Sequence, residues 1–191
     1  MLEFIKNGKG EILNLFFKNP DGVYYLREIA KNLNKEPAYY QRNLASLVAD
    51  GILQDERKGN LRLFKLNKIH PLYEELKSMI SKTIGAEYQL KDLMNEFEEI
   101  TCAFVFGSIA SNQEVVDSDI DLMIIGNPDS DLLTEKTVEL ERKLGREINY
   151  HIYNRDEIIK KLEEKDSFFV NVLNSKLIIL KGNINDYANF I

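Results

Sequence analysis

The feature that most constrains this chain is an apolar segment that ends in a glycine-serine pair and is followed, at short spacing, by two aspartates. The segment Thr101–Phe106 runs into Gly107-Ser108, and Asp119 stands twelve residues after the glycine, with Asp121 two residues further on. This pattern predicts a strand, a tight turn that opens a helix, a loop, and a second strand at Ile120–Ile125. Because side chains alternate between the two faces of a strand, Asp119 and Asp121 are expected to point the same way.

The two aspartates predict a metal site beside a phosphate-binding turn. Carboxylates held close together repel each other unless a cation lies between them. Mg²⁺ is commonly bound by one or two carboxylates together with substrate phosphates. A glycine-serine turn at a helix start offers backbone N–H groups to such phosphates. The combination predicts phosphoryl or nucleotidyl transfer, with Asp119 and Asp121 at the metal and Gly107 and Ser108 at the phosphates.

The same residues resemble a known family signature. Gly107-Ser108-Ile109-Ala110 and Ser118-Asp119-Ile120-Asp121-Leu122 are similar to the motifs of the DNA-polymerase-beta-like nucleotidyltransferase superfamily, in particular its small members, over roughly residues 85–182. The resemblance implies that Asp119 and Asp121 are catalytic ligands of one or two Mg²⁺, and that Ser108 binds the β- and γ-phosphates. It also implies an NTP substrate, with ATP favoured, whose NMP is transferred to a hydroxyl acceptor. Small members include proteins that adenylylate a partner, so a partner protein is one acceptor that the resemblance implies.

The chain departs from this family pattern in two places. Members carry a third carboxylate on the next strand, where it completes the metal site and accepts the proton of the attacking hydroxyl; here that position aligns with Asn149. An asparagine offers a carbonyl oxygen but does not take a proton. Glu147 and His151 share the expected face of Asn149 and are partial substitutes. Members also carry a basic residue and a glycine in the loop where this chain has Ser111–Glu114, which predicts weaker triphosphate binding.

The first third of the chain has the pattern of a small DNA-binding module. It predicts three helices, Glu11–Asn19, Leu26–Asn34 and Pro37–Asp50, and a β-hairpin with a basic tip, Gly51–Gln54 with Leu61–Leu66. This order resembles a winged helix-turn-helix, in which the third helix enters the major groove and the wing contacts phosphates. The DNA-binding candidates lie on the third helix and the wing: Tyr39, Arg42, Asn43, Arg57, Lys58 and Arg62. The alternatives are a solvated face, or a module that binds protein or RNA.

Charge also divides the chain. Residues 1–70 carry 12 Lys+Arg against 8 Asp+Glu, a net charge of +4, whereas residues 71–191 carry 13 against 23, a net charge of −10. Opposed charges predict different partners for the two parts.

The expected domains are a winged helix at 1–70, a linker helix at 71–84 and a nucleotidyltransferase-like domain with a small mixed sheet at 85–191, which together make an α+β fold. A single wing with few cations binds DNA weakly, so a homodimer would strengthen binding.

Cysteine content and hydropathy predict a cytoplasmic protein. The single cysteine, Cys102, excludes an internal disulfide and fits a reducing compartment. No apolar run approaches the ~20 residues that cross a bilayer, so no membrane partner is expected.

Three functions remain open at the level of sequence. The first is a Mg²⁺-dependent nucleotidyltransferase with a DNA-binding or partner-positioning winged helix. The second is a DNA-binding regulator whose transferase-like domain is catalytically degenerate and binds only a nucleotide or a partner. The third is a scaffold in which both parts bind a partner protein. Asn149 separates the first two, because an active enzyme needs a proton acceptor near this position.

Overall fold

The chain forms two compact units, Met1–Tyr88 and Gln89–Ile191. The structure is a computed structural model that describes residue 5 and residues 7–111 and 118–190. Each unit has its own hydrophobic core. Within these residues no helix is both long enough and apolar enough to span a bilayer.

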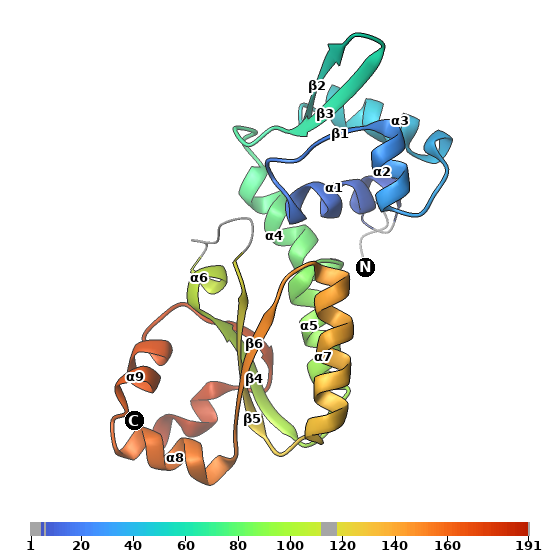
Figure 1. Cartoon of the computed structure of the whole chain (residues 1–191). Coiled ribbons are helices and arrows are strands. Elements are labelled where there is room, and N and C mark those ends of the chain that lie inside the picture. Colours follow the sequence, from blue (N-terminus) through green and yellow to red (C-terminus); the bar gives the residue numbers. More distant parts are fainter. Residues whose placement is uncertain (1–4, 6, 112–117, 191) are drawn as a thin grey trace. The chain divides into compact units, whose positions relative to one another are not determined.

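The first unit contains the three predicted helices and the predicted hairpin (Figure 1). Its elements are α1 (Gly8–Lys18), β1 (Val23–Tyr25), α2 (Leu26–Asn32), α3 (Pro37–Ala49), β2 (Leu53–Lys58), β3 (Leu61–Leu66) and α4 (Tyr73–Thr83). The strands form one antiparallel sheet in the order β1-β3-β2. Strand β1 was absent from the sequence-based prediction, because three residues that lead directly into a helix are too few to show an alternating pattern.

The core of the first unit lies between the helices and the sheet. The inner face of α3 consists of Tyr40, Leu44 and Leu47, which are buried. The hydroxyl of Tyr40 donates a hydrogen bond to Oε2 of Glu11 at 2.5 Å. Burial, and then this carboxylate, raise the pKa of Tyr40 well above its usual range. Helix α4, predicted as a linker, contributes Ile80 to the same core, so it packs with the first unit.

The second unit is built on a four-stranded mixed sheet, as predicted. Its strands are β4 (Ile100–Phe106), β5 (Ile120–Gly126), β6 (Ile148–Tyr153) and β7 (Ile178–Lys181), in the order β6-β5-β4-β7. The β5–β6 pair is parallel, and β4 is antiparallel to both β5 and β7. Cys102 is fully buried in β4, as expected of a small apolar side chain in the middle of an apolar strand.

Helices cover both faces of this sheet. Its helical elements are α5 (Ala86–Asn95), α6 (Gly107–Ala110), α7 (Ser130–Leu144), α8 (Arg155–Glu163), α9 (Ser167–Leu173) and the 3₁₀ helix η2 (Ile184–Phe190). Figure 1 shows α5 and α7 on one side of the strands, and α8 and α9 on the other. The α8–α9 side buries alternate strand residues such as Phe104, Met123 and Ile125.

The sequence pattern predicts one continuous helix over Asp156–Leu173, and this prediction is wrong. Two helices occupy this segment, and Lys165 between them has a positive φ of 53°. Oδ1 of Asp166 then accepts hydrogen bonds from the backbone N–H groups of Phe168 and Phe169, at 3.0 and 3.3 Å, and caps α9. An aspartate that caps a new helix competes with continuation of the old one.

Candidate active site

The glycine of the turn and the second aspartate lie in direct contact. In the β4–β5 ladder Phe106 is paired with Asp121, which places Asp121 beside the start of α6. Gly107 has a φ of 74°, and a methyl group in place of its hydrogen would overlap Oδ2 of Asp121. The backbone of the turn therefore approaches the carboxylate as closely as only a glycine allows.

The first aspartate and the asparagine complete the cluster. Asp119 directly precedes β5, and Asn149 is paired with Asp121 in the parallel β5–β6 register. Nδ2 of Asn149 donates a hydrogen bond to Oδ2 of Asp119 at 3.3 Å. Three side chains with oxygen atoms thus converge at one end of β5 and β6, next to the turn.

The electrostatics of this cluster favour a cation. Burial raises the pKa of Asp121, the neighbouring charge of Asp119 raises it further, and His151 opposes both effects. The ionised form of Asp121 is therefore disfavoured, and a divalent cation between the carboxylates would remove the repulsion. Two carboxylates and an amide oxygen are a suitable donor set for Mg²⁺, which takes its other ligands from phosphates and water.

The described part of the chain has no group of three or more His, Cys, Asp or Glu side chains placed to hold a metal ion. This agrees with Asn149, an amide, at the position of the third family carboxylate.

The predicted phosphate side of the candidate site is the short helix α6. Gly107 and Ser108 are its first two residues, and Phe106 before them has no side-chain cap. The hydroxyl of Ser111 donates to the carbonyl oxygens of Gly107 and Ser108, at 3.0 and 3.1 Å, and so closes the turn. The rest of the loop predicted to weaken triphosphate binding, residues 112–114, lies outside the described residues.

The six DNA-binding candidates all belong to the first unit, and their surroundings differ. On α3, Tyr39 is 45% exposed, whereas Asn43 donates to the carbonyl oxygen of Tyr39 at 3.1 Å. Arg42 is exposed on the same helix. On the hairpin, Arg57 is paired with Arg62 across the two strands, and Lys58 follows at the tip.

Arg62 forms an ion pair within the β2–β3 hairpin. Its Nε donates to Oδ2 of Asp55 at 2.7 Å, and this bond lowers the pKa of Asp55. Tyr39, Arg42, Arg57 and Lys58 therefore form the more accessible part of the predicted DNA-binding set.

Comparison with known families agrees with the geometry of the second unit. The family model "Polymerase beta, Nucleotidyltransferase" matches residues 88–184, just over half of the chain. The chain belongs to the polymerase beta nucleotidyltransferase family. No curated protein matches this nucleotidyltransferase chain.

Several solved structures are similar to about half of the chain. A toxin–antitoxin crystal structure with AMP-PNP is 17% identical, over 55% of this chain and 79% of that chain, with a TM-score of 0.38. The tri-AMPylated Shewanella oneidensis HEPN toxin in complex with MNT antitoxin is 15% identical, over 55% and 76% of the two chains, with a TM-score of 0.34. A possible transcriptional regulator from Methanosarcina mazei Go1 is 17% identical, over 49% and 82%, with a TM-score of 0.33.

Sequence reasoning missed the aromatic side chains that lie next to the candidate site. The rings of Phe106, His151 and Phe168 lie within 6.4 Å of one another, centroid to centroid. The sequence feature that indicates such a ring is the Phe168-Phe169 pair. Only one of two adjacent residues on a helix can face the core, so the other ring must lie towards solvent. The expected continuous helix concealed it.

Replacing Gly107 with alanine is expected to disrupt the nucleotidyltransferase site. The methyl group would displace the Asp121 carboxylate, and we expect the affinity for ATP with Mg²⁺, measured by calorimetry, to fall by about tenfold or more. The matched control is Gly145→Ala, because Gly145 also has a positive φ, of 69°, but has open space around it. Both variants carry backbone strain of about 1 kcal/mol, so a loss of affinity common to both would contradict the role of the Gly107–Asp121 contact.

Proposed function

We propose that the second unit is a Mg²⁺-dependent nucleotidyltransferase that transfers NMP from an NTP, with ATP the favoured substrate, to a hydroxyl acceptor. The observation that carries this proposal is the contact of Asp121 with Gly107, with Asp119 and Asn149 beside it. In this proposal Gly107 and Ser108 hold the triphosphate through backbone N–H groups and the serine hydroxyl. Asp119 and Asp121 hold one or two Mg²⁺.

The residues around the carboxylates have complementary tasks. When bound, Mg²⁺ stabilises charge on the α-phosphate and orients the attacking hydroxyl. Asn149 restrains Asp119 through its hydrogen bond and offers its carbonyl oxygen if the amide turns. Gly107 lets the phosphates approach the carboxylates closely, since no side chain separates them.

The first unit is proposed to be a winged helix that binds DNA or positions the acceptor. Three helices followed by a hairpin with Arg57 and Lys58 near its tip support this assignment. Tyr39 and Arg42 are the proposed contacts of the third helix. The acceptor that family resemblance favours is a hydroxyl of a partner protein, and a homodimer would supply the avidity that a single wing lacks.

One observation favours a second candidate, a regulator that binds nucleotide without transferring it. Asn149 occupies the register position beside Asp121 where the family places its third carboxylate. The amide cannot accept the proton of an attacking hydroxyl, and general base catalysis typically contributes about 10²–10⁴-fold to such a step.

Incubation with α-labelled ATP and Mg²⁺ separates the two candidates. The enzyme is expected to label a partner protein or small hydroxyl acceptor in a cell extract, and the label should depend on Mg²⁺. The regulator is expected to label nothing while it binds a specific DNA site at nanomolar concentration. The same extract incubated with the Asp119→Ala/Asp121→Ala variant, in place of the unmodified protein, is the control for labelling by other proteins.

A further inference from the structure

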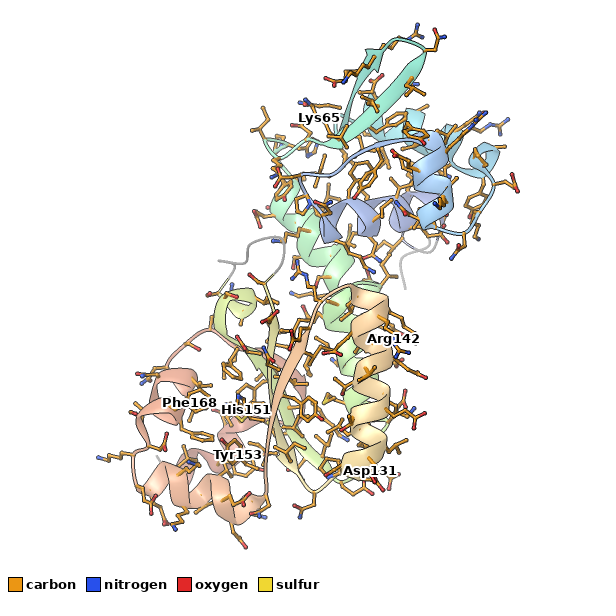
Figure 2. All side chains as sticks on the ribbon, viewed as in Figure 1. Lys65, Asp131, Arg142, His151, Tyr153 and Phe168 are labelled. Carbon is orange, nitrogen blue, oxygen red and sulfur yellow. The ribbon has the colours of Figure 1, made fainter. Side chains whose placement is uncertain are left out.

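Three aromatic rings form a cluster beside the proposed phosphate site. Phe106, His151 and Phe168 come from β4, β6 and α9, and we call them the aromatic ledge. Their ring centroids are 6.4 Å apart for Phe106–His151, 5.9 Å for Phe106–Phe168 and 5.8 Å for His151–Phe168. Figure 2 labels His151 and Phe168, which lie next to each other. Every ring of the ledge therefore contacts the other two.

The ledge lies next to the residues that are proposed to bind phosphate and Mg²⁺. Phe106 directly precedes Gly107, and its register partner is Asp121. His151 follows Asn149 by two positions on the same face of β6, about 7 Å further along the strand. His151 also acts electrostatically on the Asp121 carboxylate. His151 is thus displaced along the strand from the carboxylate cluster, as a base is displaced from the phosphates of its nucleotide.

The rings of the ledge differ in exposure. Phe106 is only 8% exposed, whereas Phe168 is 40% exposed and His151 is exposed too. The adjacent Phe169 is 1% exposed and fills the core between α9 and the sheet. The core is thus completed by Phe169, and Phe168 leaves part of its ring open to solvent beside His151.

We propose that His151 and Phe168 stack against the base of the nucleotide whose phosphates are held at Gly107 and Ser108. This inference rests on the proposed function, and it adds the base subsite and the substrate class. The planes of the two rings meet at 61°, so one ring offers its face to a base and the other supports the edge of that base. A purine covers more of this surface than a pyrimidine. The expected substrates are purine nucleoside triphosphates, ATP among them, because a purine offers the larger face for stacking.

A fluorescent replacement at Phe168 tests the stacking directly. The chain contains no tryptophan, so Phe168→Trp places the only indole of the protein on the ledge. ATP with Mg²⁺ is expected to quench its emission, whereas inorganic tripolyphosphate with Mg²⁺ is expected to leave it unchanged. The matched control is Val170→Trp on the same helix, since Val170 is 38% exposed and outside the ledge. Equal quenching of both variants, or none for Phe168→Trp, would overturn the proposal.

Calorimetry on the full chain gives a second readout. Phe168→Ala is expected to weaken ATP binding about tenfold and to leave the affinity for tripolyphosphate unchanged. Val170→Ala is expected to change neither affinity. If Phe168→Ala lacks a cooperative thermal transition, Phe168→Leu replaces it, because leucine keeps the apolar volume without the aromatic face, and the same selective loss is expected.

The two ligands also separate this inference from the function on which it depends. If the unmodified protein binds tripolyphosphate as tightly as ATP, the ledge contributes nothing and the inference falls, while the phosphate site stands. If it binds neither ligand in the presence of Mg²⁺, the proposed function fails and the base subsite fails with it.

Discussion

Replacing both aspartates, as Asp119→Ala/Asp121→Ala, is expected to abolish Mg²⁺-dependent binding of ATP and all transfer. The two carboxylates are the proposed Mg²⁺ ligands of this cluster, and without them the metal can no longer link the triphosphate to the protein here. Calorimetric titration with ATP, with and without Mg²⁺, measures the effect. We expect the affinity with Mg²⁺ to fall by at least about 100-fold, to the level seen without the metal.

The control for this double variant removes two carboxylates of the same unit from exposed positions. Asp156→Ala/Glu163→Ala changes the net charge equally, and both residues lie on α8. This control is expected to retain Mg²⁺-dependent binding. A similar loss in both double variants would show that net charge, rather than the site, governs the affinity.

The pKa of Asp121 predicts how the metal-free site affects stability. Because the folded protein raises this pKa, the ionised carboxylate destabilises the fold once the pH exceeds the ordinary pKa of an aspartate. Asp121→Asn is therefore expected to raise the melting temperature at neutral pH without Mg²⁺, and the gain is expected to disappear at low pH, where Asp121 is protonated in both states. A lower melting temperature at neutral pH would contradict the destabilisation of the ionised carboxylate that is assigned to burial and to repulsion from Asp119.

Local patterns predicted that Asp121 and Gly107 lie close together, because the contact depends on residues that are near in the chain. Alternation along one strand placed Asp121 on a given face, and Gly107 marked the end of the preceding strand. Antiparallel pairing of β4 with β5 then brings these two residues into contact, since the connection between the strands is short. The parallel pairing of Asp121 with Asn149 spans a whole helix, and only the family resemblance indicated it.

The sequence did not predict the helix break at Lys165 or the orientation of Phe168. Both depend on competition between local and long-range interactions. The apolar spacing of residues 156–173 continues through the break at Lys165, so periodicity alone favours one helix. The break becomes favourable because Asp166 caps α9 and Phe169 enters the core. The orientation of Phe168 follows from that break, which explains why the aromatic ledge was not predicted.

The second large effect is expected from restoring a carboxylate at position 149. In Asn149→Asp, a third carboxylate would lie beside Asp121, at the register position that the amide now occupies. It would complete a three-carboxylate metal site and could accept the proton of the attacking hydroxyl. We expect transfer of label from α-labelled ATP to rise by about 10²-fold, the lower end of the range for general base catalysis.

The same substitution has an opposite effect on the metal-free protein. The hydrogen bond from Asn149 to Asp119 would be lost, and a third negative charge would join two that already repel. The melting temperature of Asn149→Asp without Mg²⁺ is therefore expected to fall, and addition of Mg²⁺ is expected to raise it more than in the unmodified protein. Differential scanning fluorimetry across a Mg²⁺ series measures both.

Asn149→Ala is the control that separates a gained base from a lost hydrogen bond. Alanine removes the restraint on Asp119 without adding an acceptor for a proton, so no increase in transfer is expected. If Asn149→Asp binds Mg²⁺ more tightly yet transfers no more label than the unmodified protein, the missing base does not limit the reaction. The chain would then be best described as a nucleotide-binding regulator, because the restored site would have metal and substrate but still no turnover.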